Sequence, residues 1–207
     1  MTNTINHLQY SEKYGCWEGE LHVQLPPSLS STAPYPVAIL IDTSNPLTDR
    51  DTNTIHYIRD HFSNIYYSFL EALLSWQSEG HVFESYEEQT GSFVPLHFVN
   101  PQDIHIYLGT PVLQILPGYF QGEFSYYSLE FFKNCRLSIE HGLTGIFHNN
   151  ILIDLAPSDT EAMLSLLSYI EPDYERWKKD FWKVTFTLKD KIFEDPAVSK
   201  QMWLGRS

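Results

Sequence analysis

The residues best suited to chemistry lie in segment 135–150, CRLSIEHGLTGIFHNN. The adjacent Glu140 and His141 are side-chain types that general acid–base catalysis uses, and both types also bind metal ions. Gly142 follows directly, and glycine can leave the β region so that the chain turns between two strands. A catalytic pair, a metal site and a structural corner are therefore three open interpretations of this motif.

Other catalytic and metal-binding patterns are missing from the sequence. It contains no glycine-rich phosphate loop and no G-x-S-x-G nucleophile elbow, and its nine histidines form no HxH or HExxH unit. Cys16 and Cys135 lack the spacing of a disulfide framework or a zinc site, so we interpret both as buried free thiols. We therefore expect no metal ion and no cofactor, and spacing alone identifies no catalytic residue.

Charge is the most informative bulk property of the chain. The formal net charge is −13, and the 73 residues between Arg59 and Lys133 contain no Lys or Arg but nine Asp or Glu. Such a surface repels nucleic acid and anionic membranes, whereas it can steer a basic protein partner into fast association. The alternative is acidity that serves solubility alone. The candidate partner-binding residues are four acids of this stretch: Glu79, Glu84, Glu87 and Glu88.

Length and composition predict one sizeable domain. The chain has 207 residues, and 43% of them are hydrophobic, which is enough to fill a core. No signal-like segment opens the sequence, and no apolar run approaches the roughly 20 residues of a membrane-spanning helix. We expect a cytoplasmic protein with an acidic α+β domain at residues 1–170. Residues 171–207 carry balanced charge and are expected to form a helical segment packed on the same domain.

A long amphipathic helix is predicted over residues 54–78. Its apolar residues recur mostly at spacings of three and four, which places them on one face. Asp51, Thr52 or Asn53 is the expected cap at its start, and Gly80 is expected to end it. The helix therefore has one side to bury against a sheet.

The remaining patterns predict a mainly antiparallel sheet with helices after it. Period-two alternation, or a short apolar run, indicates a strand, and clusters of turn residues separate the strands. In segment 80–95 the apolar and polar residues recur with no firm period, so we expect this segment to form an acidic loop. The predicted strands are 16–25, 37–42 and 103–116, then a meander of 119–132, 135–140, 143–148 and 151–155 with a turn at Asn149-Asn150, and helices follow at 158–170 and from Tyr174.

At the motif, the sequence resembles a known group of proteins. Residues Cys135, Glu140, His141, Gly142 and Leu143 follow the pattern Cys-x4-Glu-His-Gly-Leu. This pattern is similar to that of uncharacterised bacterial domains related to the immunity proteins of polymorphic toxin systems. The segment WEGE at 17–20 and the aromatic-rich helix fit the same layout. The resemblance implies a toxin-neutralising role and no established catalytic residues.

Two hypotheses from different classes follow. The first is an immunity protein that binds a basic protein toxin and neutralises it by occluding its active site. It predicts tight, salt-sensitive association and no catalytic activity of its own. The alternative is a small metal-dependent or acid–base hydrolase with Glu140 as general base and His141 as ligand or acid.

Overall fold

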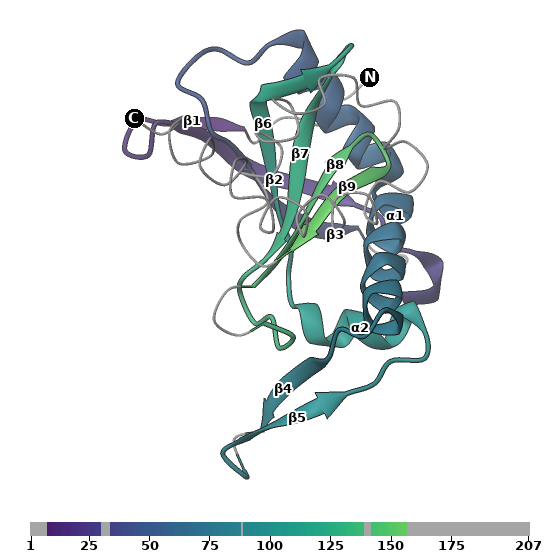
Figure 1. The fold of residues 1–207 in the computed structure, drawn as a ribbon. Coiled ribbons are helices and arrows are strands. Elements are labelled where there is room, and N and C mark those ends of the chain that lie inside the picture. Colours follow the sequence, from purple (N-terminus) through teal and green to yellow (C-terminus); the bar gives the residue numbers. More distant parts are fainter. Residues whose placement is uncertain (1–7, 30–33, 88, 139–141, 157–207) are drawn as a thin grey trace, which may run out of the picture.

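A seven-stranded sheet with one long helix across it forms the body of the protein (Figure 1). The computed structural model describes residues 8–29, 34–87, 89–138 and 142–156. The strand order is β1-β2-β3-β6-β7-β8-β9, and β4 and β5 form a separate two-stranded sheet. This arrangement confirms the α+β class, with a mostly antiparallel sheet packed against a long helix.

All neighbouring strands of the large sheet run antiparallel except β3 and β6, which are parallel. Parallel neighbours need a long crossover, and here α1, the β4–β5 hairpin and α2 lie between them. A short 3-10 helix, Pro27–Leu29, follows β2. The strands of the large sheet are β1 Gln9–Ser11, β2 Cys16–Val23, β3 Tyr35–Ile41, β6 Val112–Gln121, β7 Phe124–Phe131, β8 Leu143–His148 and β9 Ile151–Ala156.

The long helix α1 spans Asp49–Ser78 and confirms the predicted amphipathic helix. It begins earlier than expected, because Thr48 is the N-cap instead of Asp51, Thr52 or Asn53. Thr48 and Asp51 form a capping box, in which each side chain accepts a hydrogen bond from the other residue's backbone N–H. Asp51 therefore belongs to the first turn of the helix and is buried there.

The core lies between α1 and the face of the sheet that it covers. Phe69 of α1 stacks on Phe131 of β7 with ring centroids 5.0 Å apart. Gly145 of β8 lies beneath the same ring, since a Cβ at this position would be 2.8 Å from Phe69 and 2.9 Å from Leu152. Glycine is thus needed here for close packing of helix on sheet.

The prediction of a strand over residues 103–116 is wrong in its first half. Residues Pro101–Leu108 form helix α2, and β6 begins only at Val112. Pro101 occupies the first turn, and the backbone N–H of Asn100 donates to the Asp103 carboxylate. The sequence alternates, but the buried residues are four apart, as one helix face requires.

Two further predictions between residues 80 and 142 are corrected. The expected acidic loop forms a β-hairpin, with β4 at Phe83–Glu87 and β5 at Ser92–Leu96. The strand expected over residues 135–140 is not formed in its described part: residues 135–138 are irregular, with a bend at 136–137, and 139–140 lie outside the described residues. A turn at residues 133–134 precedes this segment, and its Asn134 has φ of 64°. By contrast, Asn149 has φ of 55° and confirms the predicted turn between β8 and β9.

The predicted helices at 158–170 and from Tyr174, and the whole segment 171–207, lie outside the described residues. Within the residues that are described, neither helix is both long and apolar enough to cross a membrane.

Candidate binding surface

The β4–β5 hairpin projects from the end of α1, away from the large sheet (Figure 1). Its strands pair in regular antiparallel register, with Tyr86 opposite Phe93. At the turn, the N–H of Gly91 donates to the carbonyl of Glu87 at 2.8 Å, and Gly91 has φ of 65°. Glycine tolerates this backbone conformation without steric cost, so the chain reverses there.

The base of the hairpin is fixed to the end of α1. The side-chain amide of Gln77 donates to the carbonyl of Phe98 at 3.0 Å and accepts from the N–H of Phe98 at 2.9 Å. Phe83 is buried between the rings of Trp76 and Phe98. These contacts hold the first residues of β4 and the residues after β5, while the turn extends beyond them.

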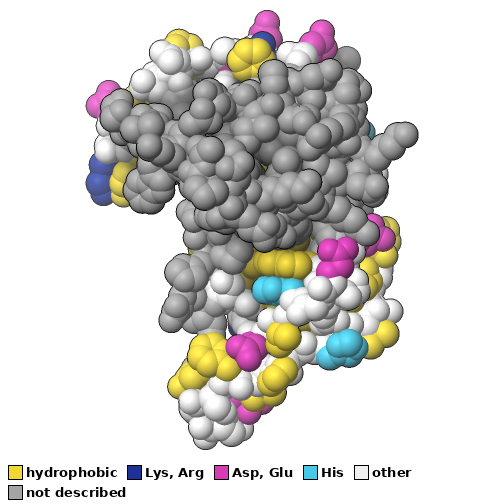
Figure 2. Space-filling view, in the orientation of Figure 1, with side chains coloured by type: hydrophobic (Ala, Val, Ile, Leu, Met, Phe, Trp, Pro, Cys, Tyr) yellow, Lys and Arg dark blue, Asp and Glu magenta, His cyan; other side chains and the backbone are white. Residues whose placement is uncertain are grey.

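One face of the hairpin is apolar, acidic and exposed. Directly paired residues of antiparallel strands lie on the same face, as do residues two apart. Glu84, Tyr86 and Phe93 therefore share a face, which we call the outward face, and Val82 lies just before β4. The exposed fractions are 60% for Val82, 42% for Tyr86 and 57% for Phe93. Figure 2 shows apolar and acidic side chains side by side at this end of the molecule.

The two rings of the outward face contact each other across the strands. The centroids of Tyr86 and Phe93 are 5.4 Å apart with an interplanar angle of 62°, an edge-to-face arrangement. An exposed aromatic pair of this kind gains little from folding, and exposed apolar patches with polar surroundings mark protein–protein contact sites.

A cavity of about 200 Å³ is lined by residues of both the hairpin and the body. Trp76 and His81 line it near the end of α1, and Glu84 and Phe93 line it from the hairpin. On the side of the body, the lining includes Ser138 and Leu143, which belong to the motif region. The structure thus brings one acid predicted from charge, Glu84, together with one predicted motif residue, Leu143.

The other predicted acids do not share this face. Glu87 lies three residues after Glu84 and pairs with Ser92, so strand alternation places it on the opposite face. Glu79 is the exposed C-cap residue of α1, and Glu88 lies outside the described residues. Among the residues that the structure describes, no cation is paired with Glu84 or Glu87.

The burial of His81 affects the charge of the cavity. Its ring stacks on Trp76 with centroids 3.8 Å apart and meets the edge of Phe83. Burial lowers the pKa of His81 below its ordinary value of 6.5, because the charged form loses its hydration. His81 is therefore neutral at neutral pH, and Glu84 is the charged residue among the lining residues that the structure describes.

The described part of the motif makes the contacts of a corner between strands. Gly142 has φ of 66°, and a Cβ there would be 2.5 Å from the carbonyl oxygen of Phe131. Its N–H donates to the carbonyl of Ser138 at 2.8 Å, which closes the turn before β8. Leu143, the first residue of β8, is buried. These contacts support the interpretation of Gly142 and Leu143 as a corner of the sheet.

The remaining motif residues offer no nucleophile in the described structure. Both cysteines are free thiols, with Cys135 buried and Cys16 partly buried. Burial raises the pKa of the Cys135 thiol, which keeps it protonated at neutral pH and poorly nucleophilic. The hydrolase alternative depends on Glu140 and His141, which lie outside the described residues.

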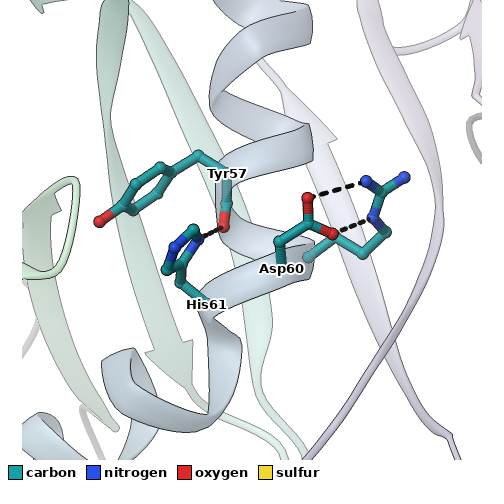
Figure 3. Close-up of polar contacts among 4 residues, drawn as sticks. Tyr57, Asp60 and His61 are labelled. Atoms are coloured by element: carbon teal, nitrogen blue, oxygen red, sulfur yellow. Dashed lines mark hydrogen bonds and ion pairs between the residues drawn. The ribbon is translucent and has the colours of Figure 1, made fainter.

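Tyr57, Arg59, Asp60 and His61 form a polar group on α1 that contains residue types used in acid–base catalysis. The guanidinium of Arg59 donates to the Asp60 carboxylate at 2.7 Å, and this contact lowers the pKa of Asp60. Nδ1 of His61 lies 3.0 Å from the carbonyl of Tyr57, on whose ring His61 stacks. Figure 3 shows that Asp60 points away from His61, so these side chains form no acid–base pair. Within the described ranges, no group of three or more His, Cys, Asp or Glu is placed to hold a metal ion.

The sequence analysis predicted Glu84 as a candidate but did not predict its aromatic neighbours, Tyr86 and Phe93. The signal was the alternation in VFESYEE and SFVPLHF, which the run of acids obscured. Trp76 and His81 had no local signal, because they reach the cavity only through the packing of the hairpin on α1.

Comparison of the chain with protein-family models, curated proteins and solved structures gave no match.

Proposed function

We propose that this chain is an immunity protein that binds a basic bacterial toxin and neutralises it by occluding the toxin's active site. The observation that carries the proposal is the outward face of the hairpin, which combines an exposed aromatic pair with the Glu84 carboxylate on a projecting element. Glu84 has no cation partner among the residues that the structure describes. The motif resemblance and the net charge of −13 support it independently.

The apolar part of this face suits a protein partner. Aromatic residues dominate the energetics of protein interfaces, because they bury a large area with few rotatable bonds. Tyr86 and Phe93 are each about half exposed and already held against each other, so binding would cost little additional side-chain ordering.

The charge of the surface suits a basic partner. The hairpin lies in the middle of the 73-residue stretch without Lys or Arg. Complementary charge raises the association rate and fixes the orientation of the complex. Glu84 would contact the partner directly, whereas Glu79 and Glu87, away from the outward face, would act mainly through long-range attraction.

The shape of the surface supports inhibition by occlusion. The hairpin tip extends beyond the body (Figure 1), and a projecting element can enter the concave active site of an enzyme. The attachment of the hairpin base through Gln77 and Phe83 keeps the tip in a defined position.

The test uses the protein encoded next to this chain as the candidate toxin. The toxin is produced in cells with and without the full chain, and growth is measured. The purified pair is then studied by association kinetics across a salt series. We expect the chain to restore growth, and we expect the association rate to fall as salt rises.

Two double variants separate local from net charge. Glu84→Lys with Glu87→Lys changes the hairpin, and Glu12→Lys with Glu18→Lys makes the same change in net charge at exposed positions near β1 and β2. We expect the hairpin variant to slow association by at least about tenfold and the control variant by much less. Equal effects would contradict the role of the hairpin, and a neighbouring toxin that is neither bound nor inhibited would overturn the proposal.

A further inference from the structure

The cavity beside the outward face has the size of a side-chain pocket. Its volume of about 200 Å³ is below the roughly 300–1,000 Å³ of pockets that hold cofactors or drug-sized ligands. It adjoins Phe93, whose ring is exposed on the surface that we propose for binding. A partner docked on the hairpin would therefore have this cavity within reach of one of its side chains.

The chemistry of the lining selects a cation. Glu84 is the one acidic residue among the described lining residues, and they include no Lys or Arg. A carboxylate facing a partly enclosed cavity with no cation beside it attracts a positive group of a partner, and a charge-assisted hydrogen bond is stronger there than in open water. Ser138 adds a hydroxyl that can accept a further hydrogen bond.

We infer that this cavity receives one arginine side chain of the partner, with the Glu84 carboxylate binding its guanidinium and the ring of Phe93 stacking on it. The inference deepens the proposed function and rests on it for the identity of the partner. Arginine fits better than lysine because its planar group can bond a carboxylate through two N–H groups and stack on an aromatic ring at the same time.

Within the described part of the chain, two guanidinium groups already lie over aromatic rings. The guanidinium of Arg50 lies 3.5 Å from the centroid of the Phe120 ring, and that of Arg136 lies 4.8 Å from the centroid of Tyr107. Arg136 is close to the cavity in sequence, but it is held against α2 and does not line the cavity. One aromatic wall of the cavity is also partly covered, since His81 stacks on Trp76. The exposed ring of Phe93 is therefore the surface available for stacking.

The test needs no toxin. The full chain is titrated with N-acetyl-arginine-N-methylamide and, separately, with its neutral isostere N-acetyl-citrulline-N-methylamide, while amide and indole resonances are followed by NMR. We expect the arginine probe to shift the indole resonance of Trp76 and the amides of Ser138 and Leu143, and we expect saturation. The citrulline probe should bind at least about fivefold more weakly, because it lacks the charge that Glu84 attracts.

The hairpin supplies a matched control variant. Glu84→Gln and Glu87→Gln remove the same charge from the same strand, but only Glu84 lines the cavity. We expect Glu84→Gln to weaken binding of the arginine probe at least about fivefold. Glu87→Gln should change the affinity for the probe by less than about twofold. Phe93→Leu should also weaken it, because the stacking surface is lost.

The outcomes separate this inference from the proposed function. Equal binding of the two probes, shifts elsewhere in the molecule, or no saturation would overturn the arginine pocket, even if the toxin bound tightly. Saturable arginine binding that depends on Glu84, in a chain that neither binds nor inhibits the neighbouring toxin, would support the pocket and overturn the proposed function.

Discussion

The body and the hairpin place similar aromatic pairs in opposite environments. In the body, Phe69 and Phe131 stack at 5.0 Å and are completely buried. In the hairpin, Tyr86 and Phe93 meet at 5.4 Å, yet both remain about half exposed. The centroid distances are similar, although the first pair is stacked and the second is edge-to-face, but only the first pair is removed from water. The body therefore uses this aromatic pair to stabilise the fold, whereas the hairpin leaves much of the apolar area of its pair exposed to water.

This comparison predicts a large difference between two phenylalanine truncations. Phe69→Ala should lower the free energy of unfolding by about 3–5 kcal/mol, because it opens a cavity in the core. Phe93→Ala should lower it by less than about 1 kcal/mol, because its ring is already exposed. Urea unfolding followed by circular dichroism measures both. An equal loss for the two variants would show that the hairpin ring also belongs to the core.

The corner between the body and the cavity gives the second prediction. Gly142→Ala should lower the free energy of unfolding by about 3 kcal/mol, since it combines a positive φ with a Cβ only 2.5 Å from the carbonyl of Phe131. Gly15→Ala is the matched control, because Gly15 has φ of 68° but no atom within 4 Å of its Cβ position. It should cost only about 1 kcal/mol. Equal losses of stability in the two variants would mean that the close approach between position 142 and the carbonyl of Phe131 does not restrict which residue can stand there.

The body was more predictable from the sequence than the hairpin, and for a physical reason. A helix that buries one side must repeat its apolar residues every three or four positions, so α1 was visible in the sequence. The turn at Asn149 was visible because Asn tolerates positive φ. The start of α1 was misplaced, since Thr48 and Asp51 both have capping side chains and only the packing decides between them.

The failures concern segments in which the pattern was ambiguous. In α2, Ile104, Ile106 and Leu108 alternate as a strand would, while Ile104 and Leu108 also lie on one helix face. In the hairpin, the acids of β4 suggested a solvated loop. The cavity could not be predicted at all, because it joins residues near 76, 84, 93 and 138 that no local pattern connects.

A third prediction tests how the body holds the start of α1. The buried carboxylate of Asp51 accepts hydrogen bonds from the hydroxyl of Ser125 at 3.0 Å and from the hydroxyl of Thr48 at 2.7 Å. Asp51→Asn should cost about 2 kcal/mol of stability, because an amide replaces one acceptor oxygen with a donor and leaves partners unsatisfied. Asp49→Asn, an exposed position in the same turn, should cost less than about 0.5 kcal/mol. Similar losses of stability in the two variants would mean that Asp51 stabilises α1 only through its charge near the helix dipole and not through its hydrogen bonds.

The smallest expected effect compares two histidines, one in each region. His105 of α2 is hydrogen-bonded to Tyr66 in the body, and His81 stacks on Trp76 at the base of the hairpin. Burial lowers the pKa of both below their ordinary value of 6.5. Both histidines therefore bind protons more tightly in the unfolded chain than in the folded chain. Their contribution to the free energy of unfolding is fully present above pH 6.5, and it is lost as the pH drops through their folded-state pKa values. Unfolding measured between pH 8 and pH 5 should show this loss.

Variants of the two histidines show which region is responsible for the loss. His105→Asn removes the titrating group but keeps a polar atom near Tyr66, and His81→Asn does the same beside Trp76. Each variant should reduce the pH dependence of the free energy of unfolding, and the double variant should reduce it more than either single variant does. If only His105→Asn had an effect, the acid sensitivity would belong to the body alone. At low pH the base of the hairpin, like its exposed tip, would then be coupled only weakly to the folding of the body.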